Sequence, residues 1–300
     1  MKDQADRLRE IAKEVKHSKK EMLKEIKHTR IVVVSSGKGG VGKSTIALNL
    51  AISLCIKGKK VIIMDADLGT ANIDIMLGVI PKYNLFDVVQ GRKHLQDIII
   101  SGPKGLNIIP GGSGITELAN LNKQELQRTL AELGNLDGQF DYLLIDTGAG
   151  INQNVVTFLL SADDLIIVTT PEPTSITDAY GLIKTVAGQA QGKIFYLVVN
   201  RVESKKEGLQ VAERFKQVCQ QFLNLKINVL GYVVNEPLVG EGIRRQCPFM
   251  EIFPRTQAAR NINAIAGNLI KTNSQDTSNS FNYTGIKQFF KKIMGLGILE

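Results

Sequence analysis

The chain has 300 residues, of which 43% are hydrophobic, and it carries a formal net charge of +8. This length and composition suit one large α/β domain with a full core and shorter appendages; no uninterrupted apolar run is long enough to cross a bilayer, and no secretory signal opens the sequence. The three cysteines lie far apart and fit no disulfide or metal spacing, which favours free thiols in a reducing cytoplasm.

The first segment, residues 1–28, is polar with helical periodicity, because small and apolar residues recur at intervals of three and four. It is too polar to fold alone, so we expect a docking helix or a frayed arm. Residues 1–30 carry a net charge of +4, and residues 271–300 carry +2. Basic ends suit nucleic acid, an anionic membrane or an acidic partner, and charge alone does not choose among them.

Residues 29–270 alternate between strand and helix patterns. Most of the predicted strands are continuous apolar runs, which indicates that helices cover both faces of the sheet. The alternation predicts an α/β fold with a doubly wound, mostly parallel sheet that binds its ligand at the carboxyl ends of the strands. The predicted strands are 31–36, 60–65, 106–109, 141–146, 164–170, 194–200 and 228–234. The predicted helices are 44–57, 122–136, 152–161, 175–190, 206–223 and 257–270.

A phosphate-binding loop, GKGGVGKS at residues 37–44, stands between the first predicted strand and the first predicted helix. In the pattern G-x-x-x-x-G-K-[ST], backbone N–H groups cradle phosphates, the lysine reaches the terminal phosphates and the hydroxyl holds Mg²⁺. The flanking strand and helix aim the helix N-terminus at the phosphate. We therefore expect Lys43 at the phosphates and Ser44 at the metal.

Three aspartates end two later strands. Asp65 and Asp67 follow an apolar run, and because side chains two positions apart in a strand point the same way, this pair can hold a metal or orient a water. Asp146 ends another apolar run, at the position from which a carboxylate reaches Mg²⁺, often through water. We expect Asp146 at the metal, with a helix N-cap as the alternative.

The C-terminal part begins with residues 271–284, whose Ser, Asn and Thr content predicts a flexible linker. Residues 285–300 return to an amphipathic pattern with a lysine-rich back, which is typical of a helix lying in an anionic membrane interface. A terminal helix docked on the core would satisfy the same pattern. The predicted membrane contacts are Phe289, Phe290, Ile293 and Met294.

The loop 37–44, the Asp65–Asp67 pair and the segment 146–150 together resemble the deviant Walker A family of ATPases, which includes MinD, ParA, the nitrogenase iron protein and FlhG. The resemblance covers about residues 30–270. It implies that ATP joins two subunits face to face, that Lys38 reaches the partner subunit's nucleotide, and that Asp67 orients the attacking water.

The same resemblance fixes the expected site residues. Catalytic roles fall to Lys38, Lys43 and Asp67, and the metal would be held by Ser44, Asp65 and Asp146. Nucleotide contacts are expected from Gly37, Lys38, Gly39, Gly40, Val41, Gly42, Lys43, Ser44 and Thr45, with Asn200, Arg201 and Pro237 at the base.

The two ends narrow the resemblance to one branch. Residues 3–9, DQADRLR, match the D-Q-A-x-x-L-R element of FlhG (also called FleN), and the C-terminal helix resembles those of MinD and FlhG. In that branch the element binds FlhF, a signal-recognition-type GTPase, and stimulates its GTP hydrolysis. The resemblance implies control of flagellar number and placement, with FlhF, switch-ring (C-ring) proteins and the inner membrane surface as partners. The residues expected to act on the GTPase are Asp3, Gln4, Leu8 and Arg9.

Other functions remain open at this point. A MinD-like regulator of the division site would share the ATPase domain and the membrane helix. A ParA-like partition ATPase would use the basic N-terminus to bind DNA, although the basic residues show neither a helix-turn-helix pattern nor interleaved aromatics, which makes nucleic acid an improbable partner. A metabolic phosphotransferase is a weaker option, because no lid or substrate-specificity domain is evident.

Overall fold

The computed structural model describes residues 28–67, 72–111, 123–190, 192–275 and 283–296. In these residues, eight strands form one sheet in the order β3-β4-β2-β5-β1-β6-β7-β8. Neighbouring strands are parallel throughout except for β3 and β4. The strands are β1 (Arg30–Ser36), β2 (Val61–Ala66), β3 (Ile100–Ser101), β4 (Asn107–Ile109), β5 (Tyr142–Ala149), β6 (Asp164–Thr169), β7 (Ile194–Val202) and β8 (Ile227–Val234).

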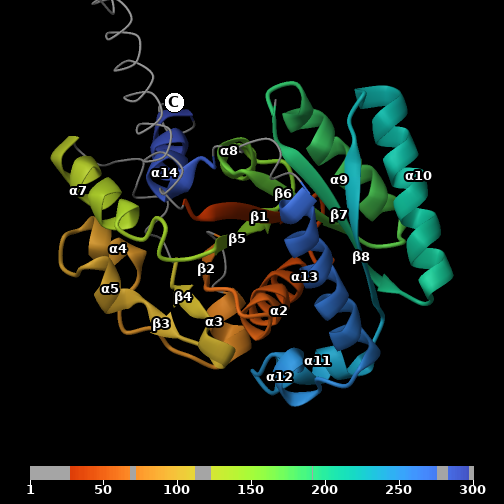
Figure 1. Ribbon diagram of the computed structural model, residues 1–300, viewed down its shortest axis with the longest axis horizontal. Coiled ribbons are helices and arrows are strands. Elements are labelled where there is room, and N and C mark those ends of the chain that lie inside the picture. The colour runs from red at the N-terminus through yellow and green to blue at the C-terminus, as the bar shows by residue number, and fades with distance from the viewer. Residues whose placement is uncertain (1–27, 68–71, 112–122, 191, 276–282, 297–300) are drawn as a thin grey trace, which may run out of the picture.

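Helices cover both faces of this sheet (Figure 1). Successive side chains of a strand point to opposite faces, so Ile31 and Val33 enter one apolar core while Val32 and Val34 enter the other. The first core is covered by α4 (Leu85–Val89), α5 (Leu95–Ile98), α7 (Lys123–Gly134), α8 (Gln153–Ser161), α9 (Pro173–Ala187), α10 (Lys205–Leu223) and α14 (Gly285–Leu296). The second is covered by α2 (Lys43–Ile56), α3 (Asn72–Leu77), α12 (Phe249–Ile252) and α13 (Gln257–Gln275), with α11 (Pro237–Arg244) beside α12.

The predicted fold class is confirmed, and each predicted strand and helix of the domain is present with its ends shifted by a few residues. The sequence did not predict the antiparallel strand β3, the 3₁₀ turn η1 (Pro103–Gly105) or the short helices α3, α4, α5, α11 and α12. These elements have at most eight residues, which is too short for a 3.6-residue period to stand out.

The first residues of the linker predicted at 271–284 are helical, because α13 continues to Gln275. The helical repeat of α13 packs Ile265 and Leu269 into the second core, and its polar last turn simply extends that helix. Residues 276–282 lie outside the described part of the chain, and Tyr283 and Thr284 lead directly into α14.

The C-terminal helix α14 is docked on the domain rather than set apart from it. It contacts α7, α8 and β1, and the two helices lie beside it in Figure 1. The side chains predicted to enter a membrane are buried here: Phe289, Phe290 and Ile293 are at most 2% exposed, and Met294 packs partly against the same core. The alternative prediction, a terminal helix docked on the core, describes the structure, because the apolar face of α14 packs into the first core in the groove between α7 and α8.

Candidate nucleotide-binding site

The phosphate-binding loop joins β1 to α2 at the carboxyl edge of the sheet. Gly40 and Gly42 have φ values of 79° and 90°, which residues with a Cβ rarely adopt, so these glycines allow the tight turns of the loop. A Cβ at Gly37 would lie 2.1 Å from the backbone carbon of Asp178 in α9, so this glycine permits a close backbone approach. Helix α2 begins at Lys43 and presents its N-terminus to the loop.

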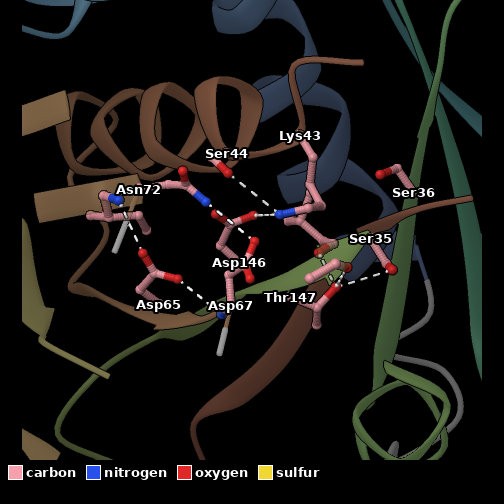
Figure 2. A network of polar contacts seen from close by, with 12 residues as sticks. Ser35, Ser36, Lys43, Ser44, Asp65, Asp67, Asn72, Asp146 and Thr147 are labelled. Carbon is pink, nitrogen blue, oxygen red and sulfur yellow. Dashed lines mark hydrogen bonds and ion pairs between the residues drawn. The ribbon is translucent and has the colours of Figure 1, made fainter. Parts of the chain in front are cut away.

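Lys43 and Asp146 form a buried ion pair at this edge (Figure 2). Lys43 Nζ lies 2.6 Å from Asp146 Oδ1 and 3.4 Å from the hydroxyl of Ser44. Burial raises the pKa of Asp146 above its ordinary range, and the nearby Lys43 ammonium opposes that rise. Asp146 Oδ2 is buried and has no hydrogen-bond partner among the described residues. An orphaned carboxylate oxygen close to a serine hydroxyl fits a divalent cation or a water bound to one.

Asp65 lies beside Asp146, because the two residues are paired in register on β2 and β5. Both of its oxygens accept backbone N–H groups, from Asp67 at 3.0 Å and from Ile73 at 3.0 Å (Figure 2). Burial raises the pKa of Asp65 to about 7, and the charge of Asp146 adds to the rise. In this arrangement Asp65 fixes both ends of the segment that follows β2, a role that the strand pattern did not reveal.

Asp67 stands at the start of that segment. Its Oδ2 accepts a hydrogen bond from the Asn72 amide at 3.3 Å, and its Oδ1 lies 3.7 Å from where a Cβ of Gly148 would be. A cavity of about 310 Å³ lies between these residues and α8, and Asp67, Gly148, Asn152 and Phe158 line it. A carboxylate that faces a cavity at the carboxyl ends of β2 and β5 is suitably placed to orient a water.

Lys38, the extra lysine of the loop, points toward the start of α9. Its Nζ lies 3.0 Å from Glu172 Oε2 and 3.1 Å from Thr174 Oγ1, and both charged side chains are exposed. Neither partner of Lys38 was predictable from the sequence. The only available signal was the Pro-Glu-Pro run at the end of β6, which marks a helix start but no contact with the loop.

The three residues expected at the base meet around one cavity of about 410 Å³. Asn200 and Arg201 from the end of β7 line it together with Pro237 from the start of α11. The Asn200 amide also donates a hydrogen bond to the Val41 carbonyl at 2.7 Å, which ties the pocket to the phosphate-binding loop. The other lining residues, which the sequence analysis did not name, include Ile46, Glu236, Val239, Ile243 and Phe249.

The candidate GTPase-activating residues Asp3, Gln4, Leu8 and Arg9 lie outside the described residues. Within the described residues, no helix combines the length and apolar character needed to span a membrane.

Comparisons with known proteins point to one family of ATPases. A family model described as an AAA domain matches residues 29–193. The antiactivator FleN of Pseudomonas aeruginosa is 35% identical over 79% of this chain and 85% of its own length. The flagellum site-determining protein YlxH of Helicobacter pylori is 36% identical over 89% of this chain and 90% of its own length.

Among solved structures, the septum site-determining protein MinD from Pyrococcus horikoshii, complexed with Mg-ADP, matches with a TM-score of 0.66 and 26% identity. The match covers 82% of this chain and 98% of MinD. The phosphate-binding loop, the aspartates of β2 and β5 and these similarities show that the chain belongs to the FlhG- and MinD-like branch of the ParA family of P-loop ATPases, whose cofactors are ATP and Mg²⁺.

Proposed function

We propose that the chain is an ATP-dependent, dimerising switch that regulates flagellar number and placement. The observation that carries the proposal is the buried carboxylate of Asp146, whose Oδ1 holds Lys43 and whose Oδ2 lacks a partner among the described residues. A site of this kind is completed by a nucleotide and its cation. The flagellar assignment draws on the similarity to an antiactivator and to a flagellum site-determining protein.

For ATP binding, Lys43 has three N–H donors, so it can retain Asp146 and also donate to a terminal phosphate. Ser44 and Asp146 would hold Mg²⁺, which supplies positive charge against the charge that develops on the phosphates during transfer. Asp65 fixes the position of Asp67, and the Asp67 carboxylate orients the attacking water. Asn200, Arg201 and Pro237 would enclose the base.

For dimerisation, Lys38 leaves Glu172 and Thr174 and reaches the nucleotide of a second subunit. The Lys38 side chain is 42% exposed, and its ammonium pairs with an exposed carboxylate, an interaction that contributes only about 0–1 kcal/mol. A phosphate cluster is a far stronger attractor for an ammonium than one exposed glutamate, so the exchange favours the assembled state.

For membrane attachment, α14 would leave its groove and lie on an anionic bilayer. Phe158 lines the cavity that Asp67 faces, and its ring lies 6.1 Å from the ring of Phe289 in α14. If ATP binding rearranges the residues around Gly148 and Asn152, the Phe158 side chain of α8 would therefore transmit that movement to α14. A dimer presents two such helices, and avidity makes attachment depend on the nucleotide.

For its output, the N-terminal arm would stimulate FlhF through Gln4, whose carboxamide can hydrogen-bond an attacking water. The test is GTP turnover by purified FlhF with and without a peptide of residues 1–28, beside the same peptide carrying Gln4→Ala. We expect stimulation by the first peptide and none by the second. Absence of stimulation by either peptide would refute the FlhF role.

The second candidate is a MinD-like division-site regulator, which the similarity to the Pyrococcus horikoshii septum protein favours. Removing residues 1–28 separates the two functions. A division-site regulator keeps its partner activity after this truncation, whereas the flagellar switch loses its action on the GTPase. Switch-ring proteins as partners belong to the flagellar proposal and would be sought by co-purification with the ATP-bound chain.

A further inference from the structure

One carboxylate fastens two segments that are far apart in the sequence. Asp163 Oδ2 accepts the backbone N–H of Ile31 at 2.9 Å, and Asp163 Oδ1 accepts the backbone N–H of Thr284 at 2.9 Å. Ile31 lies in β1, just after the chain leaves the N-terminal arm, whereas Thr284 immediately precedes α14. Asp163 therefore links the start of the domain to the start of the C-terminal helix.

A second carboxylate, that of Asp137, holds the residues before β1 and lies close to the turn into α14. Asp137 Oδ1 accepts the backbone N–H of Thr29 at 2.9 Å, and Asp137 Oδ2 lies 2.7 Å from His28 Nδ1. The turn into α14 closes on this pair at Gly285, which has a φ of 70°. A Cβ there would lie 2.6 Å from Asp137 Oδ2 and 3.0 Å from His28 Nδ1, so the approach requires glycine.

Arg30 provides a third link between the two segments. Its guanidinium pairs with the buried Asp164 and lies 5.7 Å from the ring centre of Tyr283, the residue before Thr284. Arg30 is only 3% exposed, and a desolvated guanidinium gains more from an aromatic face than an exposed one does. Asp163 thus hydrogen-bonds both segments, while Asp137 and the Arg30–Asp164 pair hold the start of the domain and lie against the residues that lead into α14.

We infer that residues 28–31, which we call the arm root, and helix α14 form one coupled unit, so that undocking α14 loosens the point at which the N-terminal arm joins the domain. Undocking removes Thr284 from Asp163, Tyr283 from Arg30 and the Gly285 turn from Asp137. The contact between His28 and Asp137 is partly exposed to solvent, with side chains 39% and 19% exposed, and exposed polar pairs contribute little. By linkage, loosening the arm root must weaken α14 docking by the same factor.

This inference goes beyond the proposed function. If the arm acts on a GTPase and α14 acts on a membrane, the coupling makes each responsive to the state of the other. The coupling itself involves only contacts within the chain, so its test needs no GTPase, membrane or nucleotide. Failure of the proposed function would leave this test unaffected, and failure of this test would leave the proposed function standing.

The test is amide hydrogen exchange on the full-length chain. The N–H groups of Thr29 and Ile31 are useful probes, because their acceptors are Asp137 and Asp163, the carboxylates next to the residues that lead into α14. Phe289→Glu, which places a charge in the buried face of α14, should speed exchange at both amides at least tenfold. Lys291→Glu, on the exposed face of the same helix, should leave both rates unchanged. Asp137→Ala should in turn speed exchange within residues 286–294.

A disulfide keeps the test decisive if Phe289→Glu unfolds the chain. A Cβ at Gly134 of α7 would lie 3.3 Å from the Cβ of Lys287, near the roughly 3.5–4.5 Å that disulfides span. In the double variant Gly134→Cys/Lys287→Cys, oxidation should slow exchange at Thr29 and Ile31 relative to the reduced protein. Equal rates in the two forms, or fast exchange in α14 with an unchanged arm root, would overturn the inference.

Discussion

Lys43 Nζ lies 2.6 Å from Asp146 Oδ1, and the two residues are 6% and 0% exposed. The lysine expected at the phosphates is thus held by the aspartate expected at the metal, in the strand next to the loop. Burying two charges is expensive, and the pair is tolerated because each charge compensates the other. In the proposed site, one hydrogen bond would therefore couple phosphate binding by Lys43 to cation binding by Asp146.

The first prediction concerns the stability of this pair. Lys43→Ala leaves the Asp146 charge buried alone and should lower the free energy of unfolding by roughly 3–5 kcal/mol. The double variant Lys43→Ala/Asp146→Asn removes both charges and should recover most of that loss, while ATP turnover stays abolished in both. Urea denaturation measures the difference. If the double variant is no more stable than Lys43→Ala, the unpaired charge of Asp146 is not the cause of the lost stability.

The second prediction concerns pH. Burial raises the pKa of Asp65 to about 7 from an ordinary value of 3.8, so between these values the native chain holds a proton that the unfolded chain has released. Asp65 therefore stabilises the fold most below pH 4, and this contribution is lost as the pH rises through about 7. The loss is on the order of a few kcal/mol.

Unfolding measured without nucleotide at pH 5 and at pH 8 checks this effect. Asp65→Asn should reduce the decrease in stability between the two values, even though it also disturbs one backbone hydrogen bond. The exposed-site control Glu251→Gln should keep the wild-type difference. Burial of Asp146 raises its pKa in the same direction, so part of the decrease persists in Asp65→Asn.

The third prediction concerns Lys38 and its partner in the same subunit. Lys38→Ala should keep nucleotide binding but lose ATP-driven dimers, because the positive charge offered to the second subunit is gone. Glu172→Ala releases Lys38 from its exposed ion pair, so dimers should form at an ATP concentration up to about fivefold lower. Light scattering against ATP concentration reports both. Normal dimers from Lys38→Ala would remove the proposed contact across the dimer.

The strands and the phosphate-binding loop could be predicted from the sequence, whereas the contact between Lys38 and Glu172 could not. The strands were predictable because runs such as Ile31–Val34 are apolar on both faces, and the loop because its glycines and lysine have fixed spacing. Glu172 was not predictable as a partner of Lys38, because that contact joins residues 134 positions apart.

For the C-terminal helix, the sequence predicted the helix but not the surface that its apolar face contacts. Its periodicity correctly predicted a helix with Phe289 and Phe290 on one side. An apolar stripe has the same period whether it meets lipid or protein, so the pattern could not identify what covers it. The answer depends on Phe158 in α8 and Leu133 in α7, which belong to the same core and become neighbours of α14 only in the folded chain.

The last prediction tests whether α14 must leave its groove to bind a membrane. In Gly134→Cys/Lys287→Cys, the oxidised chain keeps α14 on α7, so its phenylalanines cannot reach lipid. Burial raises the pKa of Cys55 and of Cys219 to about 11, so neither thiol competes for the new disulfide near neutral pH, and Cys247→Ser removes the third native thiol.

We expect the reduced chain with ATP to sediment with anionic liposomes. The amount of oxidised chain that sediments under the same conditions should be at least tenfold lower. Adding reductant to the oxidised sample should restore binding, which distinguishes the effect of the disulfide from any effect of the substitutions themselves. Phe289→Glu should bind poorly in either redox state, because a charged side chain disfavours the lipid interface as well as the groove. Equal sedimentation of the oxidised and reduced chains would assign α14 a purely structural role, with its lysines rather than its phenylalanines facing any anionic surface.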